Sequence, residues 1–356
     1  MAWFSEAPNS LGAIMAQAND VSTKEEADAK NEAADTDTAE KKSIADGVDD
    51  DWFNFRVAAL MKERDQAANT FLNRTGRLWF FHNQKAGGTS LCKLMQPRFN
   101  KAPVHACFLK PKCFHPWLSC PEKGEIRSLT DTYNLNSTAS FSSVQARVRF
   151  VERQMKSNRN RLVTSELSFI PRPVLREWIV RGNPEYSKLF ESWSFVLNLR
   201  HPVQRLESAF YFHTDTFKDC RKLTLDQCLW NTTYFSRGPH RNKLVKELSG
   251  FFAPAELEGV EATREDLHLA KLVLARFLPP IVYDTPEQLS ESLYTTFSTY
   301  LNVSLPDPSS INAQKGKAKK DPMTKAAETW IKEHNELDME LYEYALRMAQ
   351  RETLAH

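Results

Sequence analysis

A glycine pair placed between a lysine and two hydroxyl residues is the first feature with clear chemical potential. The segment Lys85-Ala86-Gly87-Gly88-Thr89-Ser90 follows an apolar run at 77–82, and helical spacing of apolar residues begins at Leu91. Glycine lets backbone N–H groups approach an anion closely, and a following helix start adds its positive end. The lysine would supply a charge, and the two hydroxyls would supply donors. The pattern predicts a phosphate-binding loop, with a ligand-free glycine turn as the alternative.

The order of residues in this loop differs from that of a Walker P-loop. In the Walker pattern the lysine follows the last glycine, whereas Lys85 precedes both glycines in this sequence. An ATP or GTP loop is therefore disfavoured.

A second candidate anion site follows the apolar run at 193–200. Arg200 ends this run, and Pro202 stands at the first turn of the next expected helix, where its missing N–H is tolerated. Ligands of parallel sheets bind at the carboxyl ends of the strands, and Ser208, two turns into the helix, can project to the same side. Arg205 lies between them and is expected to point elsewhere. A solvated strand exit is the alternative for Arg200 taken by itself.

The elements that must position these residues alternate along the chain. Apolar runs predict strands at 77–82, 161–166, 193–200 and 281–284, and helical spacing predicts helices at 141–158, 173–182, 267–278, 287–300 and 323–353. Alternating strands and helices are typical of a parallel α/β sheet. We therefore expect one P-loop-like domain over residues 52–356, a parallel sheet flanked by helices, with residues 97–140 as an insertion.

The composition divides the chain into two unlike parts. The net charge of +2 combines −9 over residues 1–51 with +11 over the rest, and 41% of the residues are hydrophobic. That fraction excludes a fully disordered or fibrous chain, and a basic body favours an anionic ligand. Residues 1–51 are polar and acidic, so we expect a disordered tail or stem. No apolar run reaches the roughly 20 residues of a membrane span, and the start lacks the order of a signal peptide.

The cysteines and glycosylation triplets bear on the compartment. The six cysteines fit disulfides in an oxidising compartment, although scattered thiols in the cytosol fit as well. Zinc is disfavoured because no Cys-x-x-Cys pair occurs. Asn-x-Ser/Thr triplets favour a secretory route. They begin at Asn73, Asn136, Asn231 and Asn302.

The two loops together resemble those of sulfotransferases that use 3′-phosphoadenosine 5′-phosphosulfate (PAPS), and in particular the Golgi carbohydrate sulfotransferases of the heparan and chondroitin type. Those loops read like HxxKxGGTS and RxPxxRxxSxF. The matching residues are His82, Lys85, Gly87, Gly88, Thr89, Ser90, Arg200, Pro202, Arg205, Ser208 and Phe210. Later segments, from Arg241-Asn242-Lys243 to Leu337-Asp338, extend the resemblance over roughly residues 77–346. Asn83-Gln84 and Ala86 depart from the family pattern, which often has a proline before the lysine and a threonine after it.

This resemblance implies the sulfotransferase fold and transfer of the sulfuryl group of PAPS to an acceptor hydroxyl, which leaves 3′-phosphoadenosine 5′-phosphate (PAP). A carbohydrate is the expected acceptor. Lys85 would contact the transferring group, and Ala86, Gly87, Gly88, Thr89 and Ser90 would hold the 5′-phosphate. Arg200 and Ser208 would bind the 3′-phosphate, and no metal is implied. Glu166, at the end of a strand, is the expected general base, with His105 and His115 as alternatives.

The resemblance also implies a location and partners. The expected location is the Golgi lumen, as a glycosylated type II membrane protein whose anchor lies outside this sequence, with the cytoplasm as the alternative. The acceptor is the expected partner, and nucleic acid is not. A basic run at Lys315, Lys317, Lys319 and Lys320 is either solvated or close to the donor. Other readings are a sulfotransferase of small metabolites, a P-loop-like nucleotide kinase, and a non-catalytic binding module.

Overall fold

The structure is a computed structural model, and it describes the chain in parts. These are residues 50–81, 83, 86–87, 91, 94–95, 144–145, 148–149, 152–153, 161–165, 170–213, 220, 223–231, 240–251, 260–305 and 323–355. The chain divides into two units, Met1–Phe55 and Arg56–His356. In the first unit only residues 50–55 are described, and they form the start of helix α2 (Asp50–Leu72). The expected tail before Asp50 and the expected insertion at 97–140 lie outside the described residues.

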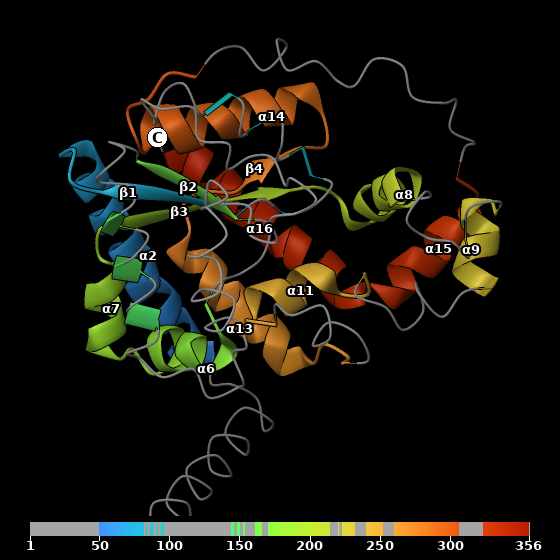
Figure 1. Cartoon of the computed structure of the whole chain (residues 1–356), viewed down its shortest axis with the longest axis horizontal. Coiled ribbons are helices and arrows are strands. Elements are labelled where there is room, and N and C mark those ends of the chain that lie inside the picture. The colour runs from blue at the N-terminus through green and yellow to red at the C-terminus, as the bar shows by residue number, and fades with distance from the viewer. Residues whose placement is uncertain are drawn as a thin grey trace, which may run out of the picture. The chain divides into compact units, whose positions relative to one another are not determined.

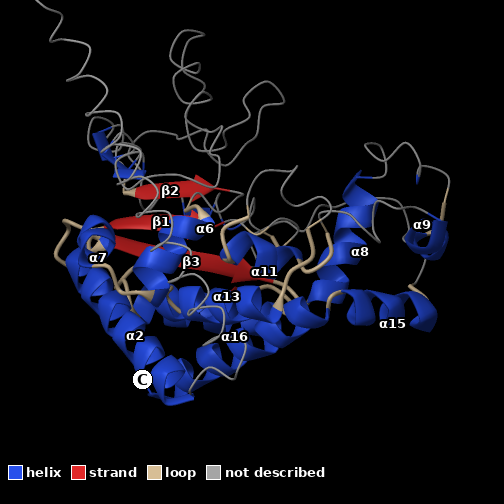
Figure 2. Cartoon of the chain, turned by 90° about the horizontal axis from the view of Figure 1, so that it is seen from below, coloured by secondary structure: helices blue, strands red, loops and turns tan. Residues whose placement is uncertain are grey.

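The second unit is built on a parallel sheet. Strands β1 (Arg77–Phe81), β2 (Leu162–Ser165), β3 (Trp193–Leu199) and β4 (Ile281–Val282) are arranged in the order β2-β1-β3-β4. Each neighbouring pair is parallel. The strand arrows point the same way, toward helix α8 (Pro202–His213) (Figure 2). The expectation of an α/β unit with a parallel sheet flanked by helices is confirmed.

Helices follow each of the strands (Figure 1). Between β2 and β3 lie α6 (Arg172–Leu175), the π-helix η2 (Arg176–Val180) and α7 (Pro184–Phe190). Between β3 and β4 lie α8, α9 (Leu225–Asn231), α11 (Lys243–Leu248) and α13 (Arg264–Arg276). After β4 come α14 (Pro286–Leu293), the π-helix η4 (Tyr294–Thr299), α15 (Lys325–His334) and α16 (Glu336–Ala355). The described residues of the helix expected at 141–158 are also helical.

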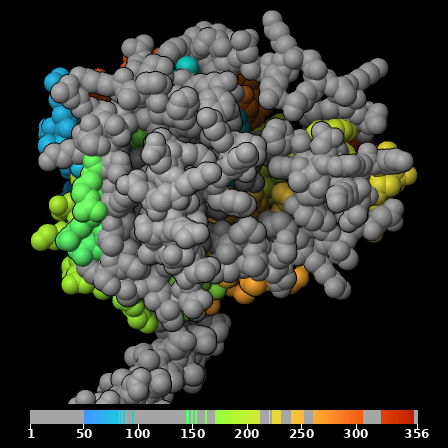
Figure 3. Space-filling view, viewed as in Figure 1, coloured from blue at the N-terminus to red at the C-terminus, as the bar shows by residue number. Residues whose placement is uncertain are grey.

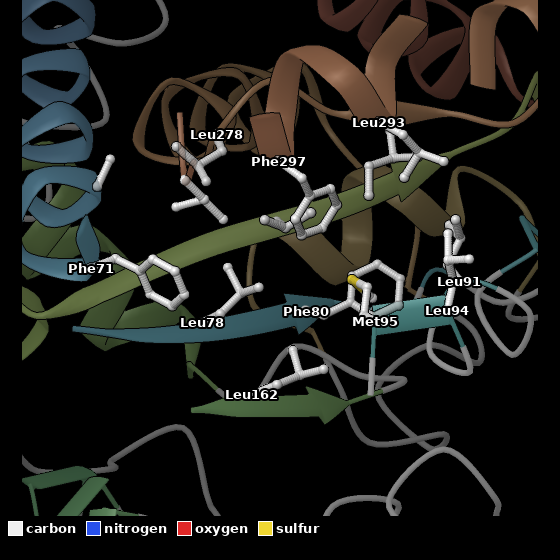
Figure 4. Close-up of a cluster of buried hydrophobic side chains, with 14 of the residues drawn as sticks. Phe71, Leu78, Phe80, Leu91, Leu94, Met95, Leu162, Leu278, Leu293 and Phe297 are labelled. Carbon is white, nitrogen blue, oxygen red and sulfur yellow. The ribbon is translucent and has the colours of Figure 1, made fainter. Parts of the chain in front are cut away.

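Side chains on alternate positions of β1 enter two different cores, because successive residues of a strand face opposite sides of a sheet. Leu78 and Phe80 enter an aliphatic core with Val196 of β3, Leu293 of α14 and Phe297 of η4. Figure 4 shows Leu78 and Phe80 on the side of β1 that faces Leu293 and Phe297. The apolar pattern of β1 therefore reflects a strand buried on both faces.

The opposite face of the sheet carries an aromatic core. The Trp79 ring lies 5.2 Å from that of Trp193, and the Phe195 ring lies 5.3 Å from that of Phe277, which follows α13. Trp178 of η2 completes the layer, with its ring 5.9 Å from that of Phe195. Such tilted and offset ring pairs add about 0.5–1.5 kcal/mol each beyond the burial of their area.

The expectation of one closing helix over 323–353 is wrong. The chain breaks at Asn335 into α15 and α16, where the backbone leaves the helical region with φ −131° and ψ 34°. The Asn335 side chain accepts a hydrogen bond from the Asn242 N–H at 2.9 Å and donates one to the Ile331 carbonyl at 2.9 Å. This contact joins segments 93 residues apart, so a pattern of apolar spacing within the last 30 residues does not contain it.

The helix expected at 173–182 also has more parts than its pattern indicated. It consists of α6 and η2 and ends before Gly182, which has a φ of +68° that glycine adopts readily. A separate helix, α7, starts after Asn183, whose side chain accepts a hydrogen bond from the Glu185 N–H at 3.0 Å. This side chain is a standard helix cap.

A buried carboxylate, Asp338 of α16, connects α16 to α11 and to α8 through hydrogen bonds. It accepts hydrogen bonds from the Leu244 and Val245 N–H groups of α11 at 3.1 and 2.9 Å, and from the Arg205 guanidinium of α8 at 3.5 Å. Burial raises the pKa of Asp338, while Arg205 and the two N–H groups act in the opposite direction. Asp338 therefore neutralises Arg205 and caps the first turn of α11 at once.

Helices α8, α9 and α15 share a separate small core that contains a disulfide. Cys220 and Cys228 are bonded, with their Cα atoms 5.4 Å apart, and both are buried. Residues of α9, coloured yellow, lie at the surface on the visible face in Figure 3. Within the part of the chain that the structure describes, no helix combines the length and hydrophobicity needed to cross a membrane.

We predict that Asp338→Ala destabilises the protein strongly. The substitution leaves Arg205 as a buried charge without its carboxylate, which costs about 3–5 kcal/mol in comparable cases. Urea unfolding should show a loss of that size. Glu336→Ala is the matched control on the same helix, because Glu336 makes an exposed ion pair with Arg264 and should change stability by less than about 1 kcal/mol. Equal effects of the two substitutions would contradict the role of Asp338.

Candidate functional site

The candidate site lies where the loop after β1 and the turn after β3 meet at the carboxyl edge of the sheet. Phe81, the last residue of β1, pairs with Leu197, so β3 extends two residues beyond the end of β1 at this edge. Of the expected site residues, Ala86, Gly87, Arg200 and Ser208 belong to the described part of the chain. Several others lie outside the described residues: Lys85, Gly88, Thr89, Ser90, Glu166, the alternative bases His105 and His115, and the lysine run at 315–320.

Asn198, near the end of β3, holds the loop after β1 in place. Its side-chain oxygen accepts a hydrogen bond from the Asn83 N–H at 2.8 Å. Its side-chain nitrogen donates to the Asn83 carbonyl at 3.3 Å and to the Ala86 carbonyl at 2.6 Å. Asn198 is fully buried, so these bonds are shielded from competing water. One side chain of β3 therefore binds three backbone groups of the candidate phosphate loop, two residues before Arg200.

Sequence reasoning did not single out Asn198, although a signal was present. A carboxamide inside the apolar strand Trp193–Leu199 has to find hydrogen-bond partners when it is buried. The strand alternation places Asn198 on the same face as Val196. The partners themselves lie 112 and 115 residues away, and that distance hid them from inspection of the local sequence.

Gly87 occupies a position that requires glycine. Its φ is +77°, and a Cβ atom placed there would lie 2.5 Å from the Tyr283 ring, which follows β4. The Gly87 carbonyl accepts a hydrogen bond from the Leu91 N–H at 3.1 Å, as at the start of a helix. The described part of the loop thus matches the expected glycine turn leading into a helix, and the Tyr283 ring lies directly against it.

Arg200 lies half-buried at the turn after β3. Its Nε donates to the Gln204 side chain at 3.4 Å, which directs the guanidinium along the first turn of α8. Burial lowers the pKa of Arg200 below its ordinary value, and Asp284 and Glu207 act in the opposite direction. A guanidinium stays charged at neutral pH in either case, so Arg200 offers a planar fork of donors to an anion.

The remaining residues of the second motif divide between site and core. Ser208 is half-buried in α8, whereas Phe210 is buried in the small core of α8, α9 and α15. Arg205 is buried and points to Asp338 and to the His240 carbonyl, 3.3 Å away. The expectation that Arg205 points elsewhere is therefore confirmed. Arg200 and Ser208 remain as the candidate ligand-binding pair.

This edge carries groups of the kind that bind anions. It combines the described glycine turn, backbone groups set by Asn198 and the cation Arg200. Among the described residues, no group of three or more His, Cys, Asp or Glu side chains is placed to hold a metal ion.

Comparison with known proteins adds no family to this picture. No family model matches the chain, and no curated protein matches it.

We predict that Asn198→Ala destabilises the protein and loosens the loop after β1. The substitution removes three hydrogen bonds to the loop backbone, at about 0.5–1.5 kcal/mol for each. The Asn83 N–H and carbonyl keep bonds to the Phe81 carbonyl and the Ala86 N–H, whereas the buried Ala86 carbonyl is left without a partner among the described residues, which raises its share to about 1–3 kcal/mol. Urea unfolding should show a loss of at least about 2 kcal/mol on that basis. Hydrogen exchange of the Asn83 amide should become faster.

Ser194→Ala provides the matched control. Ser194 is a buried polar residue on the same face of the same strand, and its hydroxyl has no hydrogen-bond partner among the described residues. Its loss should change stability by no more than about 0.5 kcal/mol, as for sites without a special interaction. An Asn198→Ala variant as stable as Ser194→Ala would show that Asn198 does not hold the loop.

Proposed function

We propose that the protein is a PAPS-dependent sulfotransferase that transfers the sulfuryl group to an acceptor hydroxyl of a carbohydrate. The observation that carries the proposal is the bonding of Asn198 to the loop after β1. Through it, the segment that resembles a 5′-phosphosulfate loop and the segment that resembles a 3′-phosphate loop lie at one sheet edge. A donor with phosphates at both the 3′ and the 5′ position of its ribose needs two anion sites that lie close to each other.

The proposed donor contacts follow from the two loops. The backbone around Gly87 and Gly88, with the Thr89 and Ser90 hydroxyls, would hold the 5′-phosphate, and Ala86 would keep the turn in place. The Arg200 guanidinium and the Ser208 hydroxyl would bind the 3′-phosphate, where a planar fork suits the phosphate oxygens. The parallel sheet with helices on both faces is compatible with a sulfotransferase fold.

The reaction is an in-line displacement at sulfur. A bond forms between the acceptor oxygen and sulfur, and the bond between sulfur and the bridging oxygen of the 5′-phosphate breaks. The electron pair of the broken bond stays on the phosphate of PAP, where Lys85 would neutralise it. Glu166 would accept the proton of the acceptor hydroxyl. As in phosphoryl transfer, the protein contributes positioning and charge stabilisation.

The disulfide and the glycosylation triplets support a location in the Golgi lumen. Cys220 and Cys228 form a buried disulfide, and disulfides persist in oxidising compartments. Asn73 and Asn302, which begin two of the four triplets, are exposed. A cytoplasmic enzyme would keep both cysteines reduced.

Thermal unfolding with candidate nucleotides tests the donor class. We predict that PAP, without metal, stabilises the wild-type protein by about 2.7 kcal/mol at a concentration of 100 times its dissociation constant. ATP and GDP, with or without Mg²⁺, should stabilise it far less. Stabilisation by ATP with Mg²⁺ and not by PAP would contradict the proposal and would indicate a nucleotide kinase.

Two variants locate the bound nucleotide. Arg200→Ala should weaken PAP binding about 10-fold or more, as expected for a lost charge-assisted hydrogen bond. Arg181→Ala is the matched control, because this exposed arginine pairs with Glu177 on the π-helix η2. PAP binding that both variants retain equally would place the nucleotide away from Arg200.

A further inference from the structure

The dipeptide Tyr283-Asp284 follows β4 and lies beside both candidate anion loops. β4 pairs with β3, with Val282 opposite Leu199, so Tyr283 leaves the sheet next to Arg200. The Tyr283 N–H donates to the Leu199 carbonyl at 2.8 Å. This bond fixes the backbone of the dipeptide to the end of β3, which lies between β4 and the loop after β1.

Tyr283 contacts the first loop. Its ring occupies the space beside Gly87, where an added Cβ atom would approach three ring carbons to 2.5–2.7 Å. β4 is separated from β1 by β3, so the tyrosine side chain has to extend across the end of β3 to reach Gly87. A flat ring against a glycine without a side chain limits how far the loop can move toward the sheet.

Asp284 contacts the second loop. One carboxylate oxygen accepts a hydrogen bond from the His201 N–H at 2.7 Å, and the other accepts one from the Tyr342 hydroxyl of α16. The His201 and Tyr342 rings pack edge to face with centroids 5.3 Å apart. The peptide that joins Arg200 to His201 is thereby fixed to a helix that packs on α13 and α11.

The two charges at this turn also influence each other. Asp284 raises the pKa of Arg200 against the larger effect of burial. Burial and the hydrogen bond to Asp284 both raise the pKa of Tyr342, so its hydroxyl remains a donor. A carboxylate that is already bonded to a backbone N–H and to a hydroxyl has little freedom to turn toward a ligand. Its contribution to Arg200 is therefore one of position.

We propose that Tyr283 and Asp284 are positioning residues that set the two halves of the donor site separately. Tyr283 sets the loop that would hold the 5′-phosphate, and Asp284 sets the backbone of the arginine that would hold the 3′-phosphate. This inference rests on the proposed function. It adds that one dipeptide, which touches neither phosphate, controls the affinity for each.

Three nucleotides separate the two halves in a calorimetric binding experiment: adenosine 3′,5′-bisphosphate (PAP), adenosine 5′-monophosphate and adenosine 3′-monophosphate. Asp284→Ala should weaken binding of the bisphosphate and the 3′-monophosphate about 10-fold, the equivalent of one hydrogen bond to a charged group. Binding of the 5′-monophosphate should stay within about twofold of wild type, a free-energy change well below that of one hydrogen bond. Tyr283→Ala should instead weaken binding of the bisphosphate and the 5′-monophosphate and leave binding of the 3′-monophosphate nearly unchanged.

Conservative variants distinguish positioning from general damage. Asp284→Asn keeps an oxygen that can accept the His201 N–H, and Tyr283→Phe keeps the ring against Gly87, so each should restore most of the lost affinity. Tyr342→Phe keeps the ring beside His201 and removes the hydroxyl bond to Asp284. Tyr342→Phe should selectively weaken binding of the 3′-monophosphate. This variant therefore tests the role of Asp284 even if Asp284→Ala does not fold. Thermal unfolding of each variant shows whether that variant is folded.

The outcomes separate this inference from the function on which it rests. Wild-type protein that binds none of the three nucleotides would reject the proposed function and this inference with it. The wild-type protein could bind the bisphosphate while the variants weaken the binding of all three nucleotides equally, or of none. That result would reject only the positioning roles. Selective loss of one monophosphate with each variant would support them.

Discussion

The arrangement of the candidate site depends on one buried carboxamide. Asn198 uses its oxygen and nitrogen to bind the Asn83 N–H and the Asn83 and Ala86 carbonyls. A buried polar group with its hydrogen bonds satisfied is stable, and it is costly to leave unsatisfied. Strand β3, which directly precedes Arg200, therefore determines where the loop after β1 begins. The separation of the two candidate loops therefore depends on the sheet and on the bonds that Asn198 makes to the backbone of the first loop.

The residues of the second motif have two different environments in the second unit. Some lie at this sheet edge, and others are buried in the core that supports it. In the segment that begins at Arg200, the next arginine, Arg205, is buried against Asp338. The same carboxylate caps α11, whose preceding residue Asn242 accepts the Asp338 N–H at 3.1 Å. Residues that a sequence motif groups together thus do two kinds of work. Arg200 and Ser208 are half-buried and stay the proposed ligand-binding residues, and Arg205 holds the helix on which Ser208 lies.

Sequence reasoning reached the parts of the fold that local patterns determine. The runs at Arg77–Phe81 and Trp193–Leu199 are buried on both faces, so composition alone indicated central parallel strands. Apolar spacing in the last helix gave no sign of the break at Asn335, where the side chain accepts a hydrogen bond from a backbone group 93 residues away. Asn198 and Asp284 also act through distant partners, which lie 58–115 residues away in the sequence. The expected donor and base residues Lys85 and Glu166 lie outside the described residues and stay predictions.

A crystal structure of the protein with adenosine 3′,5′-bisphosphate would show where the two phosphates lie relative to the carboxyl edge of the sheet. We predict that the 5′-phosphate lies within hydrogen-bond distance of the backbone N–H groups that follow Ala86, and the 3′-phosphate within hydrogen-bond distance of Arg200 and Ser208. A nucleotide bound elsewhere, or a 3′-phosphate that does not contact Arg200, would contradict it.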